Sequence, residues 1–337
     1  RYYSFTAQRD TAFQCWTGLT GRIHFFLKEN PHRGIWHTQQ VARNGLIHAV
    51  LCGTGFENRG YRYWGEPAYE QWIGSGSQLL PALAIPGRAA AALTGSRFIT
   101  MIDSLSPEVR EEAIWQELRS GNLPDFLRRP VLLERKWADA AGDSHQVVFA
   151  ALPDYLAIGS DADFVRMPMT PFTAQRAADL FGAILPTRKL VDAIYAAAET
   201  RLTPQPIPPE GDRNERPPTF LAHQHQVEKA LLMAGGVHGR LTAGHKKDIV
   251  LSNLIADPQR PGHVVIYGWH HPDARPIQPL TNIHIGRYAD YSHGVRLICA
   301  SVLVDGVPWQ VERLLADPLL YALFSDEEGV MTQRRYP

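Results

Sequence analysis

A proline-rich segment constrains how this chain can fold more strongly than any other feature of its sequence. Residues 203–218 read TPQPIPPEGDRNERPP, in which six residues are proline. Each proline fixes its backbone φ angle and lacks an amide hydrogen, so neither an α-helix nor a central strand can continue through the segment. Such a composition favours extended, semi-rigid geometry. We therefore predict a linker at 203–218 that either joins two domains or wraps around one.

Hydrophobic patterning differs on the two sides of this linker. Residues 1–93 contain short apolar runs bounded by glycine, asparagine and proline, which predict a β-rich, aromatic N-terminal region. Residues 94–202 carry helical spacing and helix caps, and predict a mainly helical region. Residues 219–337 combine one helical pattern with runs of strand length, and predict a mixed α/β unit. The whole chain is therefore expected to belong to the α+β class.

Individual elements follow from capping residues and apolar periodicity. Ser104 or Ser106, with Pro107 in the first turn, predicts a helix start, and Gly121 predicts its end. Further helices are expected at 171–181, 186–200 and 222–233, and strands at 146–152, 248–252, 263–269 and 295–304.

Composition excludes some functional classes. The chain has 337 residues, with 34 Lys and Arg against 34 Asp and Glu, so its formal net charge is zero. This balance argues against a nucleic-acid-binding protein that uses a broad basic surface. No run of 18 apolar residues occurs, so no transmembrane segment is predicted. The sequence does not indicate an oligomeric state.

Three cysteines bear on the cellular location. Cys15 and Cys52 lie in the same N-terminal region and could form one disulfide, whereas Cys299 in an apolar run is expected to be a buried strand residue. No zinc-type CxxC spacing occurs. Since the chain also begins at Arg1 without a methionine, we expect a processed protein that is secreted or periplasmic, with the cytoplasm as the alternative.

Histidines concentrate in one stretch of the sequence. Nine of the fourteen lie between His223 and His293, interleaved with lysine, aspartate and tyrosine. These side chains together can transfer protons, bind metals or hold anions near neutral pH. The stretch is therefore the predicted location of a functional site. Four of its histidines are instead expected to be surface or structural residues: His223, His225, His238 and His263.

The first candidate motif is the strand edge at residues 245–248. His245, Lys246 and Asp248 directly precede or begin an apolar β-branched run, and we predict them to be catalytic. The alternative is a solvated turn with surface lysines. Residues predicted to bind substrate, in part by holding negative charge, are Lys247, Trp269 and Arg296.

The second candidate motif is the loop 284–294, with two glycines and two tyrosines. His284, Asp290 and His293 are sufficient ligands for zinc or another divalent metal, with positions left for water and substrate. A metal-free alternative uses Tyr288, Asp290 and His293 as catalytic acid–base groups.

Part of this loop resembles the His-and-Asp pattern of zinc D,D- and L,D-peptidases that act on bacterial cell-wall peptides. In that pattern six residues separate the first histidine from the aspartate, whereas five separate His284 from Asp290, with the glycine at Gly286. The family's downstream Trp-His element is missing, because Trp269 and His270 lie upstream. The resemblance covers residues 284–293 and does not make the chain a member of that family.

A second, acidic cluster lies at 154–163. Asp154, Asp161 and Asp163 are a minor candidate for binding a cation or for facing the histidine region, and their spacing does not fit a calcium loop. Acidic loops of this kind are more often solvated.

These patterns favour a hydrolase that acts on a polymeric or peptide-like substrate, with cell-wall peptides as a candidate source. The chemistry would be metal-assisted or would use His/Asp acid–base groups. The alternative is a non-catalytic glycan-binding protein that uses N-terminal aromatics such as Trp16, Trp36, Trp64 and Trp72.

Overall fold

The computed structural model describes residues 2–7, 11–17, 23–27 and 36–38 as strands, and 83–337 in full. Its contacts divide the chain into two compact units, 1–80 with 303–308 and 81–302 with 309–337. In the first unit, four strands form an antiparallel sheet in the order β1-β2-β3-β4. Their bounds are β1 Tyr2–Ala7, β2 Thr11–Thr17, β3 Ile23–Leu27 and β4 Trp36–Thr38.

Several N-terminal expectations lie outside the described residues. The remainder of the expected β-rich region up to residue 82 is among them, and so are the aromatic side chains of the glycan-binding alternative. The disulfide prediction also falls there, because Cys52 is not described. These expectations stay predictions.

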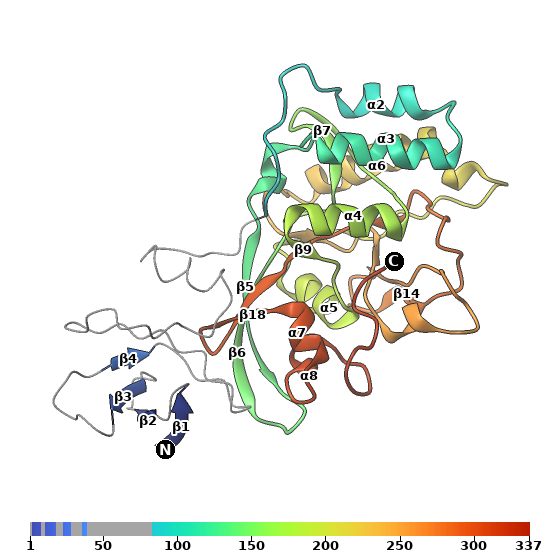
Figure 1. Ribbon diagram of the computed structural model, residues 1–337. Coiled ribbons are helices and arrows are strands. Elements are labelled where there is room, and N and C mark those ends of the chain that lie inside the picture. The colour runs from blue at the N-terminus through green and yellow to red at the C-terminus, as the bar shows by residue number, and fades with distance from the viewer. Residues whose placement is uncertain (1, 8–10, 18–22, 28–35, 39–82) are drawn as a thin grey trace. The chain divides into compact units, whose positions relative to one another are not determined.

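The second unit combines helices with most of a six-stranded sheet, whose last two strands lie partly within residues 303–308 of the first unit. The sheet has the order β18-β17-β6-β16-β9, and β5 also pairs with β6. Figure 1 shows α2, α3, α4 and α6 gathered at one end and the long β5–β6 hairpin along one side. The helices are α2 Gly95–Ile102, α3 Pro107–Arg119, α4 Pro171–Phe181, α5 Arg188–Ala197, α6 Pro217–Met233, α7 Val311–Ala316 and α8 Tyr321–Phe324. The strands of this sheet are β5 Val131–Ala138, β6 Ser144–Ala151, β9 Ala183–Ile184, β16 Ile298–Cys299, β17 Ser301–Val304 and β18 Val307–Gln310.

A smaller sheet, in the order β14-β13-β12-β15, brings the two candidate motifs together. Strand β12 pairs antiparallel with β13 and parallel with β15, although β12 and β15 are far apart in sequence. These strands are β12 Lys247–Ile249, β13 Ile266–His270, β14 Pro276–Thr281 and β15 His293–Gly294. The remaining elements are β7 Ala157–Ser160, β8 Asp163–Arg166, β10 Thr200–Arg201, β11 Thr242–Ala243, and the 3-10 helices η1 Asp125–Arg128, η2 Arg213–Glu215 and η3 Asn253–Ala256.

The α+β class predicted from the sequence is confirmed. The four predicted helices occur as α3, α4, α5 and α6. The side chains of Ser106 and Thr170 accept hydrogen bonds from backbone amides in the first turns of α3 and α4. Residues 94–202, predicted to be mainly helical, also contain strands β5 to β10. No helix in the described part of the chain has both the length and the apolar character needed to cross a membrane.

The proline-rich segment 203–218 lies inside the second unit, because the chain on both sides of it belongs to that unit. Its Ile207 amide donates to the Tyr291 hydroxyl at 2.6 Å, and the Tyr291 amide donates to the Asn214 carbonyl at 2.9 Å. These bonds attach the segment to the loop that carries the second candidate motif. The proline-rich segment therefore runs along the second unit.

Apolar packing holds strands β12 and β13 in place. Val250 and Val265, which follow β12 and precede β13, pack in one buried cluster with Val191 and Tyr267. The buried Tyr336 hydroxyl donates to the Val250 carbonyl at 2.9 Å and accepts from the Val265 amide at 2.9 Å. The sheet beneath the candidate motifs is therefore fixed by both burial and hydrogen bonds.

Gly294 of β15 provides a test of this packing. A Cβ atom there would lie 2.6 Å from Tyr155 Cδ1 and 2.7 Å from Lys246 Cβ. We predict that Gly294→Ala lowers the free energy of unfolding by about 1–3 kcal/mol through overpacking, as measured by urea denaturation. Gly87→Ala is the control, because nothing lies within 4 Å of its Cβ position, and it should leave stability nearly unchanged. Equal stabilities of the two variants would contradict the packing.

Candidate functional site

The pairing of β12 with β15 creates two chemically different faces. Lys247 is paired with His293, and Asp248 with Gly294. Because successive side chains point to opposite faces of a strand, Lys247 and His293 share one face and Asp248 lies on the other. We call the polar groups on the Asp248 side the inner network: Asp154, Tyr155, Arg166, His245 and Asp248. We call those on the Lys247 side the outer cluster: Lys247, Tyr288, Asp290, Ser292 and His293.

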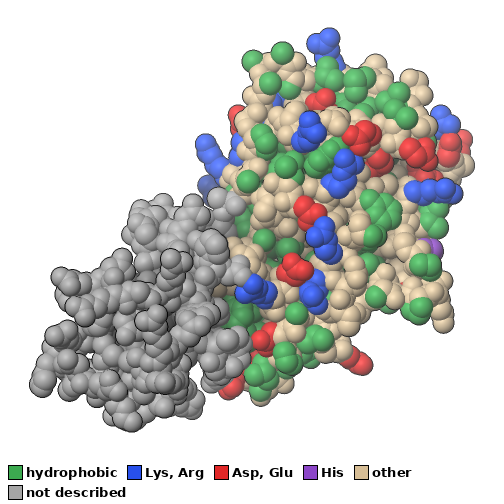
Figure 2. Space-filling model, viewed as in Figure 1, with side chains coloured by type: hydrophobic (Ala, Val, Ile, Leu, Met, Phe, Trp, Pro, Cys, Tyr) green, Lys and Arg blue, Asp and Glu red, His purple; other side chains and the backbone are tan. Residues whose placement is uncertain are grey.

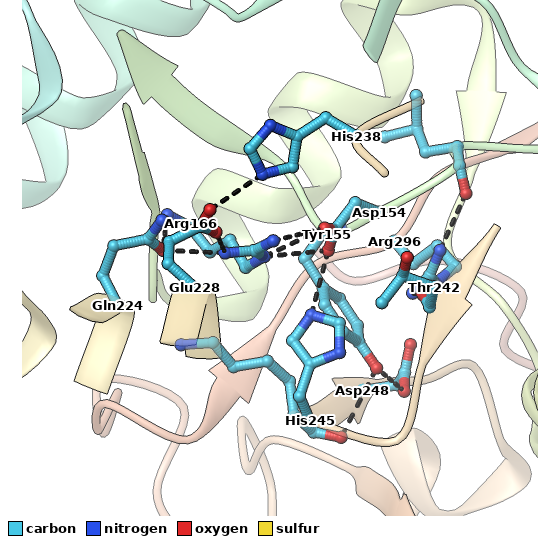
Figure 3. A network of polar contacts seen from close by, with 12 residues as sticks. Asp154, Tyr155, Arg166, Gln224, Glu228, His238, Thr242, His245, Asp248 and Arg296 are labelled. Atoms are coloured by element: carbon cyan, nitrogen blue, oxygen red, sulfur yellow. Dashed lines mark hydrogen bonds and ion pairs between the residues drawn. The ribbon is translucent and has the colours of Figure 1, made fainter. Parts of the chain in front are cut away.

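Asp154 is the centre of the inner network (Figure 3). Its carboxylate accepts from Arg166 Nη2 at 2.6 Å and Nε at 3.0 Å, and from His245 Nε2 at 3.0 Å. Burial by itself raises the pKa of Asp154, but Arg166 and His245 together, through charge and hydrogen bonds, outweigh burial and hold the pKa well below its usual range. Asp154 is thus a buried carboxylate ion with fixed partners.

Helix α6 supplies the remaining partners of Arg166. Arg166 Nη1 donates to Glu228 Oε1 at 2.6 Å and to Gln224 Oε1 at 3.1 Å, and Glu228 also binds His238 Nε2 at 2.8 Å. Burial lowers the pKa of His245 to about 4, with Asp154 partly offsetting the effect. His245 is therefore neutral near pH 7 and donates its Nε2 hydrogen to Asp154.

Asp248 and Arg296 also lie in this interior. The Tyr155 hydroxyl donates to Asp248 Oδ2 at 2.9 Å, and burial raises the pKa of Asp248 to about 6. The Arg296 guanidinium donates to the carbonyls of Leu152 at 2.8 Å and Thr242 at 2.6 Å, and stacks on the Tyr155 ring. Arg296, predicted to bind substrate, is thus buried and engaged with the backbone.

Asp290 organises the outer cluster. Its Oδ1 accepts from the Ser292 amide at 2.8 Å and the Ser292 hydroxyl at 2.5 Å, and its Oδ2 accepts from the Tyr288 hydroxyl at 2.9 Å. Lys247 Nζ lies 3.9 Å from Oδ2. Burial alone would raise the pKa of Asp290, but His293 and Lys247 outweigh it and hold the pKa below its usual range. Burial and the charge of Asp290 raise the pKa of Tyr288, which keeps its proton.

His293 is fully buried, and neither of its ring nitrogens has a hydrogen-bond partner among the residues that the structure describes. Its ring lies edge-on to Tyr288, with centroids 5.5 Å apart. Burial lowers its pKa to about 4, with Asp290 partly offsetting the effect, so the imidazole is neutral near pH 7. Buried polar atoms normally have partners, so such a group points to a functional role.

Lys246 interacts electrostatically with His293 of the outer cluster and with His223 of α6. It is buried, its Nζ donates to the Tyr291 carbonyl at 2.5 Å, and its charge lowers the pKa of both His293 and His223. Burial first and Arg166 second lower the pKa of Lys246 to about 7. Near neutral pH its amine can therefore either donate or accept a proton.

Trp269 supports the outer cluster through an unusual backbone. Its φ angle is +57°, a left-handed conformation that costs about 1–2 kcal/mol for a residue other than glycine. Lys247 Nζ lies 5.3 Å from the Trp269 ring centroid, a cation–π contact. Trp269, predicted to bind substrate, is buried and positions Lys247. The adjacent His270 binds Asp192 and stacks on Tyr195.

The proposed metal ligands lie in the same region. His284 stacks on Tyr288 with ring centroids 4.3 Å apart, and Tyr288 contacts both Asp290 and His293. Among the residues that the structure describes, no three His, Cys, Asp or Glu side chains form a group that could hold a metal ion. Metal binding by His284, Asp290 and His293 remains a prediction.

A cavity of about 360 Å³ adjoins the outer cluster, and Tyr288 and Ala289 form part of its wall. The other walls come from the start of α3, the Glu215 end of η2, and Phe220 of α6. Figure 2, viewed as Figure 1, shows acidic and basic side chains intermingled on the part of the surface where α3 begins. The cavity gives a ligand a route to Tyr288.

Sequence reasoning undervalued several residues of the site. Asp154 was only a minor candidate, and Tyr155 and Arg166 carried no motif. His223, expected to be a surface or structural residue, is fully buried with both ring nitrogens unpartnered. The spacing of Phe220, His223 and Val227 puts them on one face of α6. The apolar Phe220 and Val227 could have indicated that this face, with His223, is buried. Cys299 is buried in β16, as predicted.

Removing the carboxylate charge at Asp154 should reveal its structural role. We predict that Asp154→Asn lowers the free energy of unfolding by about 3 kcal/mol, because Arg166 loses a buried counter-charge. Asp125→Asn is the matched control, since Asp125 forms an exposed pair with Arg128 and should change stability by less than about 1 kcal/mol. Both values would come from urea denaturation, and similar losses in the two variants would contradict this role.

The lowered pKa of Lys246 has a consequence for stability. Between pH 7 and 9 an unfolded lysine keeps its proton while folded Lys246 gives it up, so stability should rise with pH. One such group contributes a slope of up to about 1.4 kcal/mol per pH unit. We predict that Lys246→Met reduces this slope and that Lys229→Met, at an exposed position on α6, preserves it. Denaturation at pH 7, 8 and 9 measures the slope, and identical slopes in both variants would exclude the effect.

Comparisons with known proteins add no relative from which a function could be inferred. No family model, curated protein or solved structure gives a significant match to this chain.

Proposed function

We propose that the protein is a hydrolase of a polymeric or peptide-like substrate and that the outer cluster is its active site. The observation that carries the proposal is His293, a neutral, buried imidazole with two unpartnered nitrogens beside the Asp290 carboxylate. A neutral imidazole next to a carboxylate is a suitable general base, because the carboxylate stabilises the imidazolium that forms.

Each member of the outer cluster has a role in this reaction. His293 takes a proton from water as the water oxygen bonds to the substrate carbonyl carbon, and later gives that proton to the leaving amine. Asp290 stabilises the protonated ring. Lys247 stabilises negative charge on the carbonyl oxygen, and Tyr288, which keeps its proton, is a hydrogen-bond donor at the cavity wall.

Access to His293 requires the Tyr288 side chain to move. Tyr288 is half-buried, lies between the cavity and His293, and is held by its hydrogen bond to Asp290 and its stacking on His284. A substrate in the cavity meets Tyr288 first. Displacing its hydroxyl from Asp290 would uncover the base only when substrate is present, which would limit unproductive chemistry.

The inner network is better suited to support than to catalysis. Asp154 and Arg166 are each engaged in several hydrogen bonds, and both are almost fully buried. The predicted catalytic residues of the first motif therefore have different roles: His245, Lys246 and Asp248. His245 and Asp248 belong to this support, whereas Lys246 can exchange protons with the outer cluster.

His293→Gln tests the proposal directly. We predict that it lowers kcat by at least about 100-fold on a peptide substrate found by screening short peptides and cell-wall fragments, with the folded state kept. His271→Gln is the control, because His271 is an exposed histidine outside the cluster, and it should retain activity. If His293→Gln also retained full activity, His293 would not be the base.

Metal analysis of the purified chain distinguishes the two chemical routes. Stoichiometric zinc that is lost in both His284→Ala and His293→Ala would favour a metal-assisted hydrolase. Activity that is insensitive to chelators in metal-free protein would favour the acid–base route.

A further inference from the structure

The cavity beside the outer cluster is lined by charges of both signs. Arg110 and Arg287 supply positive charge, and Phe220 with Tyr288 supplies aromatic surface. Three residues supply carboxylates: Glu108, Glu111 and Glu215. At about 360 Å³ it is near the small end of ligand pockets, which span roughly 300–1,000 Å³. Such a cavity accepts an end group and is too small for a long segment of polymer.

Two of these charges are fixed by the protein. Arg110 Nη1 donates to the Glu215 carbonyl at 2.9 Å, and its guanidinium lies 5.8 Å from the Phe220 ring centroid. The Glu111 carboxylate accepts from the Thr170 amide at 3.0 Å and its hydroxyl at 2.8 Å. Arg110 and Glu111 therefore shape the cavity wall.

Three charges of the lining have no hydrogen bond or ion pair of the side chain within the described residues: Glu108, Glu215 and Arg287. Glu215 is half-buried, and burial together with the nearby charge of Asp290 raises its pKa, with Arg110 partly offsetting the effect. A ligand cation beside Glu215 would stabilise its carboxylate further. Arg287 is exposed, and its planar guanidinium can bind a carboxylate through two parallel hydrogen bonds.

We propose that this cavity is a subsite for a short zwitterionic peptide such as a dipeptide, with its ammonium at Glu215 and its carboxylate at Arg287. The inference rests on the proposed function for its placement, because Tyr288 connects the cavity to Asp290. A dipeptide carries these two charges on its two residues, because each residue has one of its groups in the peptide bond. The subsite would therefore select short peptides with both ends free.

Binding measurements on the full chain test this subsite without any turnover. The probes are the dipeptide Ala-Ala, its C-terminal amide and its N-acetyl derivative, titrated by isothermal calorimetry and by NMR. We expect Ala-Ala to bind at least about 10-fold more tightly than either blocked form, because each blocked form loses one charge-assisted contact.

Substitutions at Arg287 and Glu215 test which of these residues binds which charged end of the probe. Arg287→Gln should abolish the preference for Ala-Ala over the amide, and Glu215→Gln should abolish the preference over the acetylated form. Matched controls are Arg97→Gln and Glu328→Gln, at exposed positions outside the cavity lining, and both should bind all three probes as the parent protein does.

The outcomes separate this inference from the proposed function. Equal binding of all three probes, no binding by any of them at millimolar concentration, or equal losses in the controls would overturn the subsite. End-group discrimination that persists in His293→Gln supports the subsite whether or not hydrolysis is found. Discrimination without hydrolysis of any free-ended peptide leaves the subsite standing and removes the proposed hydrolase.

Discussion

The ion pair between Asp154 and Arg166 holds together parts of the chain on which the candidate site depends. Asp154 follows β6, Arg166 ends β8, and His245 precedes β12, so one carboxylate joins three separate segments. Burying such charges costs several kcal/mol per ion unless each is paired and hydrogen-bonded. Because Glu228 and Gln224 complete the partners of Arg166, helix α6 is tied to the same point.

This arrangement also sets the protonation of the groups around it. The positive charge of Arg166 contributes to lowering the pKa values of Lys246, His245 and His223, after burial in each case. His223 and His245 therefore stay neutral at pH values where a free imidazole is protonated, and Lys246 is partly deprotonated near pH 7. Neutral imidazoles and a lysine near its pKa can accept protons, which their charged forms cannot. The charge of Lys246 in turn lowers the pKa of His293, which connects this effect to the outer cluster.

Sequence patterns predicted the fold class, and they selected the segments that form the candidate site, for identifiable reasons. A cap such as Ser106 acts within one helical turn, so α3 could be placed from local sequence. The motifs at 245–248 and 284–294 stood out because ionisable residues are dense in both. The role of Arg296 was not predictable in this way, because its partners, the carbonyls of Leu152 and Thr242, are distant in sequence.

The sequence by itself determined the chemical inventory, the α+β class and the segments that could carry a site, since composition, caps and periodicity are local properties. Tertiary structure alone decided which histidines are neutral and which carboxylates are fixed, because burial and long-range partners control both. His223 and His245 are the clearest examples, with one unpartnered and the other bound to Asp154. Parallel pairing of β12 with β15 also placed Lys247 beside His293, a contact that no local pattern encodes.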